Sequence, residues 1–151
     1  MSHSGCGCPG SMARVIEREE TTSTYTEKAP SELRQWPVQL HLVPPTAPYF
    51  QQAEILISAD CVAFALGSFL QELLKGKALA IACPKLDETD GYVQKLAAIF
   101  SANEIKSITV AIMEVPCCKG LDIMVRQALA QSGKEIPLET LVIGVDGQRR
   151  N

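Results

Sequence analysis

From Trp36 onward, the order of apolar and polar residues predicts β-strands that alternate with α-helices. The predicted strands are short β-branched or aliphatic runs, and all but the first are nearly unbroken, which suits parallel strands covered on both faces. They span residues 38–43, 54–58, 78–82, 107–115 and 140–145. The pattern therefore predicts an α/β fold with three layers: a mostly parallel five-stranded sheet with helices on both faces, flavodoxin-like or doubly wound.

Helical periodicity separates these strands. Residues 92–103 and 121–131 each repeat their apolar positions with a helical period, so each predicted helix has one face to pack on the sheet. Residues 62–74 are apolar over most of the helix surface, so we expect this helix to be the most buried, with Asp60 as its N-cap. The short segment 44–53 leaves room for one short helix.

The chain divides into two parts by composition. Residues 1–36 form an arm rich in glycine, serine, threonine and charge, whereas residues 37–151 carry the strand and helix patterns and predict a single α/β domain. A chain of 151 residues has the usual length of one domain.

Composition excludes several classes of protein. With 46% hydrophobic and 21% charged residues, the chain is not disordered throughout. A net charge of -3 and the lack of a basic stripe argue against a nucleic-acid partner. No apolar run approaches the roughly 20 residues of a membrane span, so we expect a cytoplasmic protein with no membrane partner.

The unusual feature is a set of six cysteines. Cys61 follows the second predicted strand, Cys83 the third, and Cys117 and Cys118 the fourth. The carboxyl ends of parallel strands meet at one edge of a sheet, where such folds bind their ligands, so these four thiols should converge. Cysteines that only fill a core would be expected within the strands.

Converging thiols in a reducing compartment favour an iron–sulfur cluster or zinc. We favour the cluster, because each ligand would lie near the positive end of a helix, and Lys85 and Lys119 follow Cys83 and Cys118. These positive charges should lower the thiol pKa values. Zinc stays open, although structural zinc sites usually contain a CxxC pair and this chain has none.

The arm contributes a second thiol pair, Cys6 and Cys8, in Cys6-Gly7-Cys8-Pro9. Ferredoxin-type ligand runs also end in Cys-Pro, so this pair can complete or cap the site, or belong to a flexible terminus. Cys117 and Cys118 are adjacent, so one can bind a metal while the other acts as a redox thiol.

Other polar residues carry less chemistry. His41 lies in a strand pattern and is expected to be a core histidine, and Asp87, Glu88 and Asp90 are typical of the start of a helix. No glycine-rich phosphate loop follows a strand, which argues against a nucleotide cofactor. No catalytic residue stands out, and an electron-transfer or metal-binding protein is favoured over an enzyme.

Five segments carry a resemblance to a prokaryotic family of 4Fe-4S ferredoxins and iron–sulfur-binding proteins, over nearly the whole chain. They are GCGCPGS at 5–11, LRQWPVQL at 33–40, ADCVAF at 59–64, ACPKLD at 82–87 and EVPCC at 114–118. Longer members carry an upstream ferredoxin domain with CxxCxxCxxxCP runs, and this chain looks like the stand-alone C-terminal module. The resemblance implies metal binding by the six cysteines, without a known reaction.

These observations support one leading hypothesis. The protein binds an iron–sulfur cluster of the [4Fe-4S] type and serves electron transfer or redox sensing, with a redox partner protein or ferredoxin domain. Lys85 and Lys119 would lie against the cluster, and the proposed metal ligands are Cys61, Cys83, Cys117 and Cys118, with Cys6 and Cys8. The alternative is a zinc-binding or thiol-redox interaction module that holds no iron–sulfur cluster.

Overall fold

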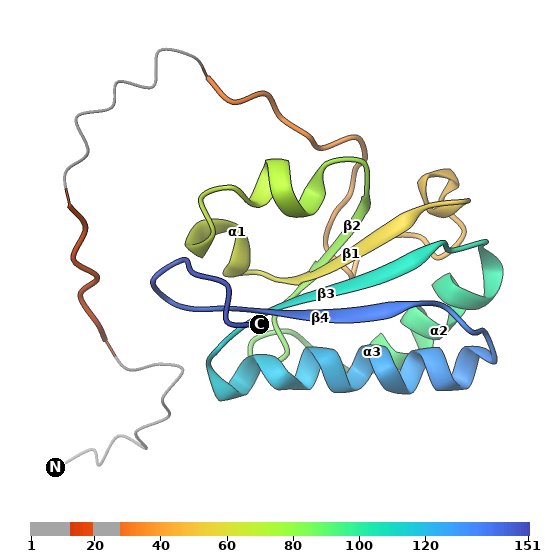
Figure 1. The fold of residues 1–151 in the computed structure, drawn as a ribbon. Coiled ribbons are helices and arrows are strands. Elements are labelled where there is room, and N and C mark those ends of the chain that lie inside the picture. The colour runs from red at the N-terminus through yellow and green to blue at the C-terminus, as the bar shows by residue number, and fades with distance from the viewer. Residues whose placement is uncertain (1–12, 20–27) are drawn as a thin grey trace, which may run out of the picture.

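The computed structural model describes residues 13–19 and 28–151, so Cys6 and Cys8 lie outside the described residues. Within the described part, four strands form one sheet in the order β2-β1-β3-β4. All neighbouring strands are parallel, as Figure 1 shows. The strands are β1 (Glu54–Ala59), β2 (Ala78–Ala82), β3 (Ser107–Met113) and β4 (Leu138–Ile143). The predicted α/β class with a parallel sheet is confirmed.

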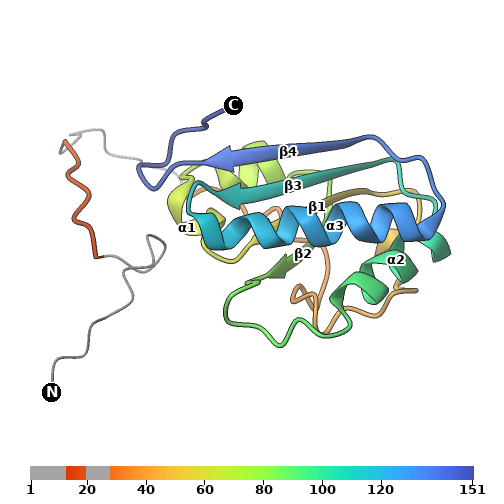
Figure 2. The same ribbon diagram turned by 90° about the horizontal axis from the view of Figure 1, so that it is seen from below.

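Helices cover both faces of this sheet. Figures 1 and 2 show α2 (Tyr92–Ala102) and α3 (Lys119–Ser132) on one face, and α1 (Val62–Ala65) and a π-helical turn (Phe69–Leu74) over the other. The division follows from the strand order, because the step from β1 to β2 runs one way along the sheet and the later steps run the other way. The three-layer arrangement is therefore confirmed, and the winding reverses between β1 and β3.

The first predicted strand, residues 38–43, is not a strand, so the sheet has four strands instead of five. Gln39 forms an isolated parallel bridge with Ile81 of β2. The N–H groups of Leu42 and Val43 then both donate to Gln39 O, which turns the chain away from the sheet. Prolines follow at positions 44 and 45, and proline lacks the N–H that a longer ladder would need.

The helix predicted over 62–74 is divided into two pieces. α1 ends after four residues, because Leu66 adopts an extended conformation with φ -93° and ψ 107°. Phe64 is 92% exposed, so the expectation that this is the most buried helix is wrong. The predicted N-cap is also wrong, since Cys61 and not Asp60 occupies that position. An apolar sequence did not reveal that the helix stops before it can cover the sheet.

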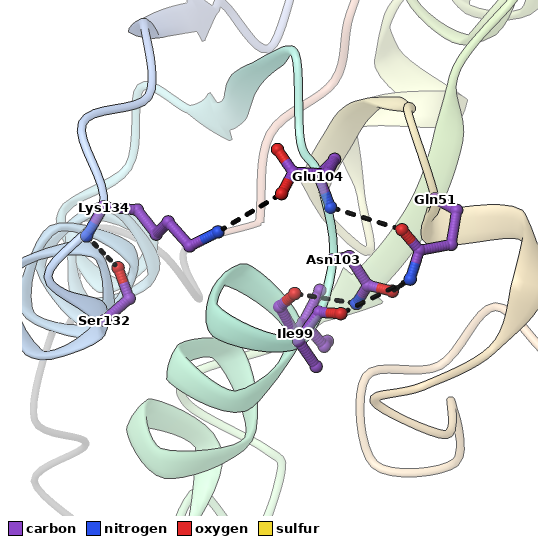
Figure 3. Close-up of polar contacts among 7 residues, drawn as sticks. Gln51, Ile99, Asn103, Glu104, Ser132 and Lys134 are labelled. Carbon is purple, nitrogen blue, oxygen red and sulfur yellow. Dashed lines mark hydrogen bonds and ion pairs between the residues drawn. The ribbon is translucent and has the colours of Figure 1, made fainter.

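A polar cluster fastens the N-terminal edge of the sheet (Figure 3). Asn103, 2% exposed, follows α2 and donates from Nδ2 to the carbonyls of Pro45 and Ile99, both at 2.8 Å. Gln51 donates to Asn103 Oδ1 at 2.9 Å. Gln51 follows the short 3-10 helix Pro48–Phe50, which confirms the short helix expected in this connection. These side-chain amides form their hydrogen bonds within the fold, so the cluster stabilises this edge of the sheet.

Residues near the end of the predicted arm pack on the outer edge of β2. The side-chain amide of Gln35 donates to Leu79 O at 2.8 Å and accepts from Leu79 N–H at 2.7 Å. It thereby pairs backbone groups that an edge strand would leave open. The division into an arm over 1–36 and a domain over 37–151 stays a prediction, and the sheet already uses residues just before that boundary.

Candidate functional site

Four cysteines lie just beyond the strand ends, and we call them the thiol edge: Cys61, Cys83, Cys117 and Cys118. Cys61 follows β1, Cys83 follows β2, and the other two end a 3-10 turn after β3. The charges of Cys83 and Cys117 act on Cys61, and the charge of Cys61 acts on Cys118. The structure therefore brings four thiols from three different loops within electrostatic range of one another.

The thiol edge surrounds the point where the winding of the sheet reverses. β1 and β3 are neighbours, yet the chain leaves them toward opposite faces of the sheet, and sheets of this kind bind their ligands at such a position. Cys61 stands on one side of this position, and Cys117 stands on the other. Cys61 is exposed, Cys83 and Cys117 are half-buried, and Cys118 is buried. The thiols thus range from the surface to the core at the place where such sheets bind ligands.

The surroundings of two of these thiols raise their pKa values. Burial raises the pKa of Cys61, and the charges of Cys83, Asp60 and Cys117 add to the effect. Burial also raises the pKa of Cys118 to about 11, against the opposing influence of a backbone hydrogen bond. The expectation of lowered thiol pKa values is therefore wrong for Cys61 and Cys118.

Helix geometry explains part of this error. α1 is only four residues long, so its end carries little of the dipole that a long helix provides. Cys83 is not at the start of a helix either, because α2 begins at Tyr92. Only Cys118 precedes a long helix, as the N-cap residue of α3, and burial outweighs the dipole there.

The raised pKa of Cys118 predicts a loss of stability at alkaline pH in protein freed of metal with a chelator. The thiol ionises near pH 9 in the unfolded chain and near 11 in the folded one, so the unfolded chain binds fewer protons between these values. Raising the pH across this window should lower the free energy of unfolding by about 2 kcal/mol. Urea titrations at each pH measure the change.

The control for this pH effect is Cys118→Ala, which should flatten the decline. Tyr92 contributes in the same direction at higher pH, since burial and its hydrogen bond to Asp87 raise its pKa. Making the Cys118 change in a Tyr92→Phe background separates the two groups. An equal decline with and without the Cys118 thiol would show that burial does not control its ionisation.

The loop that carries Cys83 is organised by Asp87. Its Oδ2 accepts from Cys83 N–H at 3.0 Å and from the Tyr92 hydroxyl at 2.8 Å, and its own N–H donates to Cys83 O at 2.9 Å. Asp87 therefore fixes the loop. Its position in the sequence suggested the start of a helix, but Gly91 is the residue before α2. Sequence reasoning missed this role, although aspartate is a known turn residue because its side chain can hydrogen-bond to the nearby backbone.

Replacing Asp87 with alanine is expected to free the Cys83 loop. The loss of two accepted hydrogen bonds at a partly buried carboxylate should lower the free energy of unfolding by about 1–3 kcal/mol and speed iodoacetamide labelling of Cys83 several-fold. Glu88→Ala removes the same charge from an exposed neighbour and is the matched control. Equal labelling rates in the two variants would contradict the role of Asp87.

Asp60 adds an unsatisfied acceptor beside the thiol edge. Its Oδ1 is buried and has no hydrogen-bond partner within the described part of the chain. Burial, together with the charge of Asp87, raises the pKa of this carboxyl group. A buried carboxylate oxygen without a donor suits a proton or a bound cation, and a phosphate placed there would meet repulsion.

The remaining predicted positions are less enclosed. Lys85 and Lys119 are exposed, next to Cys83 and Cys118 as the sequence implies. His41 is exposed and its ring centroid lies 6.3 Å from that of Tyr92, so the expected core histidine is wrong. Among residues 13–19 and 28–151, no three histidine, cysteine, aspartate or glutamate side chains are already placed to hold a metal ion.

A cavity of about 810 Å³ opens beside the thiol edge. Its wall includes Ala65 to Ser68, directly after α1, and Asp146 to Arg149, in the turn after β4. Glu72 of the π-helical turn and Arg18 of the predicted arm complete the lining. Sequence reasoning missed this cavity, because its walls come from separate segments that no sequence pattern connects.

No helix in the part of the chain that the structure describes has the length and apolar character needed to cross a membrane. Residues 47–150 match the family model of a Rossmann-like domain. The chain belongs to the Rossmann-like domain family. This Rossmann-like domain is also similar to a protein of Archaeoglobus fulgidus named only as uncharacterized, with 34% identity over 116 residues, which is 77% of this chain and 81% of the relative. No solved structure matches the chain significantly.

This Rossmann-like domain differs from dinucleotide-binding ones in the turn after β1. A dinucleotide site has a glycine-rich turn there, so that the backbone can approach a pyrophosphate. The corresponding turn here contains Asp60, with one buried carboxylate oxygen, and the Cys61 thiol in place of those glycines. This turn therefore offers sulfur and carboxylate donors, a set that suits a metal ion better than a phosphate.

Proposed function

We propose that this protein binds an iron–sulfur cluster of the [4Fe-4S] type at the thiol edge and serves electron transfer or redox sensing. The observation that carries the proposal is the convergence of thiols from three separate loops at the point where the winding of the sheet reverses. Cys61, Cys83, Cys117 and Cys118 are the first-choice ligands, and Cys6 and Cys8 complete or cap the site. When bound, the cluster supplies one-electron chemistry.

The electrostatics of the thiol edge support a cationic occupant. Burial raises the pKa values of both Cys61 and Cys118, and the negative charge of neighbouring thiols adds to the rise at each. Iron coordinated by the thiolates would offset that repulsion, because metal binding drives off the thiol protons. Lys85 and Lys119, exposed beside Cys83 and Cys118, would balance the negative charge of a four-thiolate cluster.

One feature of the site favours a second candidate, a thiol-redox module without iron. Cys117 and Cys118 are adjacent in the chain, and two neighbouring thiols can cycle between a dithiol and a disulfide. Zinc bound by the same thiols is the third possibility. The three candidates differ in their content of iron, sulfide and zinc, so elemental analysis of one preparation distinguishes them.

The test is purification of the full chain without oxygen, followed by iron, acid-labile sulfide and zinc analysis and electron paramagnetic resonance. The proposal expects about four iron and four sulfide per chain, the composition of a [4Fe-4S] cluster, with a spectrum that appears on one-electron reduction. Folded protein without iron and sulfide overturns it. Zinc at one per chain would indicate the zinc module, and a two-electron thiol–disulfide couple in iron-free protein would indicate the redox module.

A further inference from the structure

The cavity beside the thiol edge has no part in the proposed function. Its volume of about 810 Å³ is within the range of sites that hold small molecules. It lies between the segment after α1 and the turn after β4, and both segments follow the carboxyl ends of strands. Open α/β sheets bind their ligands outside these strand ends. Size and position therefore both indicate a ligand site.

Two arginine side chains on the cavity wall hydrogen-bond to backbone and not to a carboxylate. Arg18 Nη1 donates to Asp146 O at 2.8 Å, and Arg149 Nε donates to Asn151 O at 2.6 Å. Within residues 13–19 and 28–151, neither guanidinium forms an ion pair. A guanidinium has five N–H donors, so both arginines keep donors and a positive charge for a ligand.

The neighbouring Arg150 differs, because it is paired with two acids. Its Nε lies 3.0 Å from Glu114 Oε2, and its Nη2 lies 3.0 Å from Asp146 Oδ1. Asp146 also accepts a hydrogen bond from Gln148 N–H at 2.9 Å, and these contacts hold its pKa below the usual value. The Asp146 carboxylate is therefore engaged by Arg150, although it lines the same cavity as Arg18 and Arg149.

Glu72 adds a carboxylate of another kind to the wall. It lies in the π-helical turn, is exposed, and forms no ion pair in the part of the chain that the structure describes. The wall thus presents two unpaired positive groups and one unpaired negative group. A phosphate would gather up to two negative charges at one point, and Glu72 would repel it. A ligand with two separate carboxylates and a hydrogen-bond donor matches all three groups.

We propose that this cavity binds a small dicarboxylic acid that also carries a hydroxyl or amino group. Arg18 and Arg149 each bind one carboxylate, and Glu72 accepts a hydrogen bond from the hydroxyl or amino group. The proposal does not rest on the proposed function, because none of these three residues is a thiol and no metal takes part in the binding.

The first experiment compares three acids with one four-carbon skeleton. Succinate has two carboxylates and no other donor, L-malate adds a hydroxyl group, and L-aspartate adds an amino group. Isothermal titration of the full chain, freed of metal with a chelator, should give a Kd of about 1 mM or lower for malate or aspartate, as is usual for metabolites. Succinate should bind roughly tenfold more weakly, because it cannot donate to Glu72.

The stronger of malate and aspartate identifies the donor as a hydroxyl or an amino group. A Kd well above about 1 mM for both acids would overturn the proposal. Tighter binding of inorganic phosphate than of either acid would also overturn it, since the site would then select phosphate. Iron and sulfide content does not enter this readout, so the result is separate from the test of the proposed function.

Arg18→Gln and Arg149→Gln should each weaken binding of the preferred acid at least roughly tenfold, through the loss of charge-assisted hydrogen bonds. Arg34→Gln is the matched control, because it removes the same charge from an exposed residue that lines a separate pocket. It should bind the acid as the parent does. Parent-like affinity in both cavity variants would show that the arginines do not hold the ligand.

Glu72→Ala should remove the preference for malate or aspartate over succinate, so that the three acids bind alike. Glu135→Ala is the control, since it removes an exposed acid from the connection between α3 and β4, at the opposite edge of the sheet. It should keep the parent's preference. A preference that survives Glu72→Ala would exclude Glu72 as the acceptor and contradict the three-point arrangement.

Discussion

A Cys61→Ser variant purified without oxygen is expected to carry at least roughly tenfold less iron and sulfide than the parent protein. Losing a residue that only hydrogen-bonds to a metal ligand lowers metal affinity tenfold to a hundredfold, and losing the ligand itself should lower it more. Its spectrum on one-electron reduction should disappear with the iron. The fold should survive, since Cys61 is exposed and an exposed substitution changes the free energy of unfolding by no more than about 0.5 kcal/mol. Cys61 therefore gives a cleaner test than the buried Cys118.

The comparison variant is Ala63→Ser, which places the same new side chain at an exposed position of α1 and leaves every thiol in place. It should match the parent in iron, sulfide and spectrum. Urea titration of both variants after chelation checks that their folds are equally stable. A Cys61→Ser protein with the parent's iron content would remove Cys61 from the ligand set, and the same result at Cys83 and Cys117 would refute a cluster at the thiol edge.

The strands and the two long helices could be predicted because each depends on its own sequence. β2 is found at the predicted residues 78–82, and α2 and α3 lie over the predicted 92–103 and 121–131 with small changes at their ends. These segments are apolar in the period that their partners require, so local pattern and tertiary packing agree.

Residues 38–43 and 62–74 failed for the opposite reason. Leu40 and Val43 are fully buried as the pattern predicts, but they lie in a turn and not in a strand. In the second segment the extended conformation of Leu66 ends α1 early, so Phe64 is left at the surface. An apolar run predicts that its side chains will be buried. Which element buries them depends on packing against other parts of the chain.

The candidate site divides in the same way. That Cys61, Cys83 and Cys117 share one edge follows from a parallel sheet, so the sequence was sufficient. The sign of the pKa shifts was not predictable, because it depends on how deeply the turn after β3 buries Cys118. The contact of Arg18 with Asp146 was not predictable either, since it joins two segments with no shared pattern.

A Gly147→Ala variant is expected to lower the free energy of unfolding by about 2–4 kcal/mol, the sum of a left-handed conformation for alanine and a steric clash. The residue has φ +88°, and the new Cβ would lie 2.6 Å from the backbone oxygen of Ala65. The clash would be with backbone and not with a flexible side chain, so it cannot be relieved by a change of rotamer. Urea titration of protein freed of metal measures the loss.

Gly133→Ala separates the two causes. Gly133 also has a positive φ, +69°, but a Cβ there would meet nothing within 4 Å, so only the conformational cost of about 1–2 kcal/mol should remain. A Gly147 variant no more costly than the Gly133 variant would mean that the turn after β4 does not press on α1.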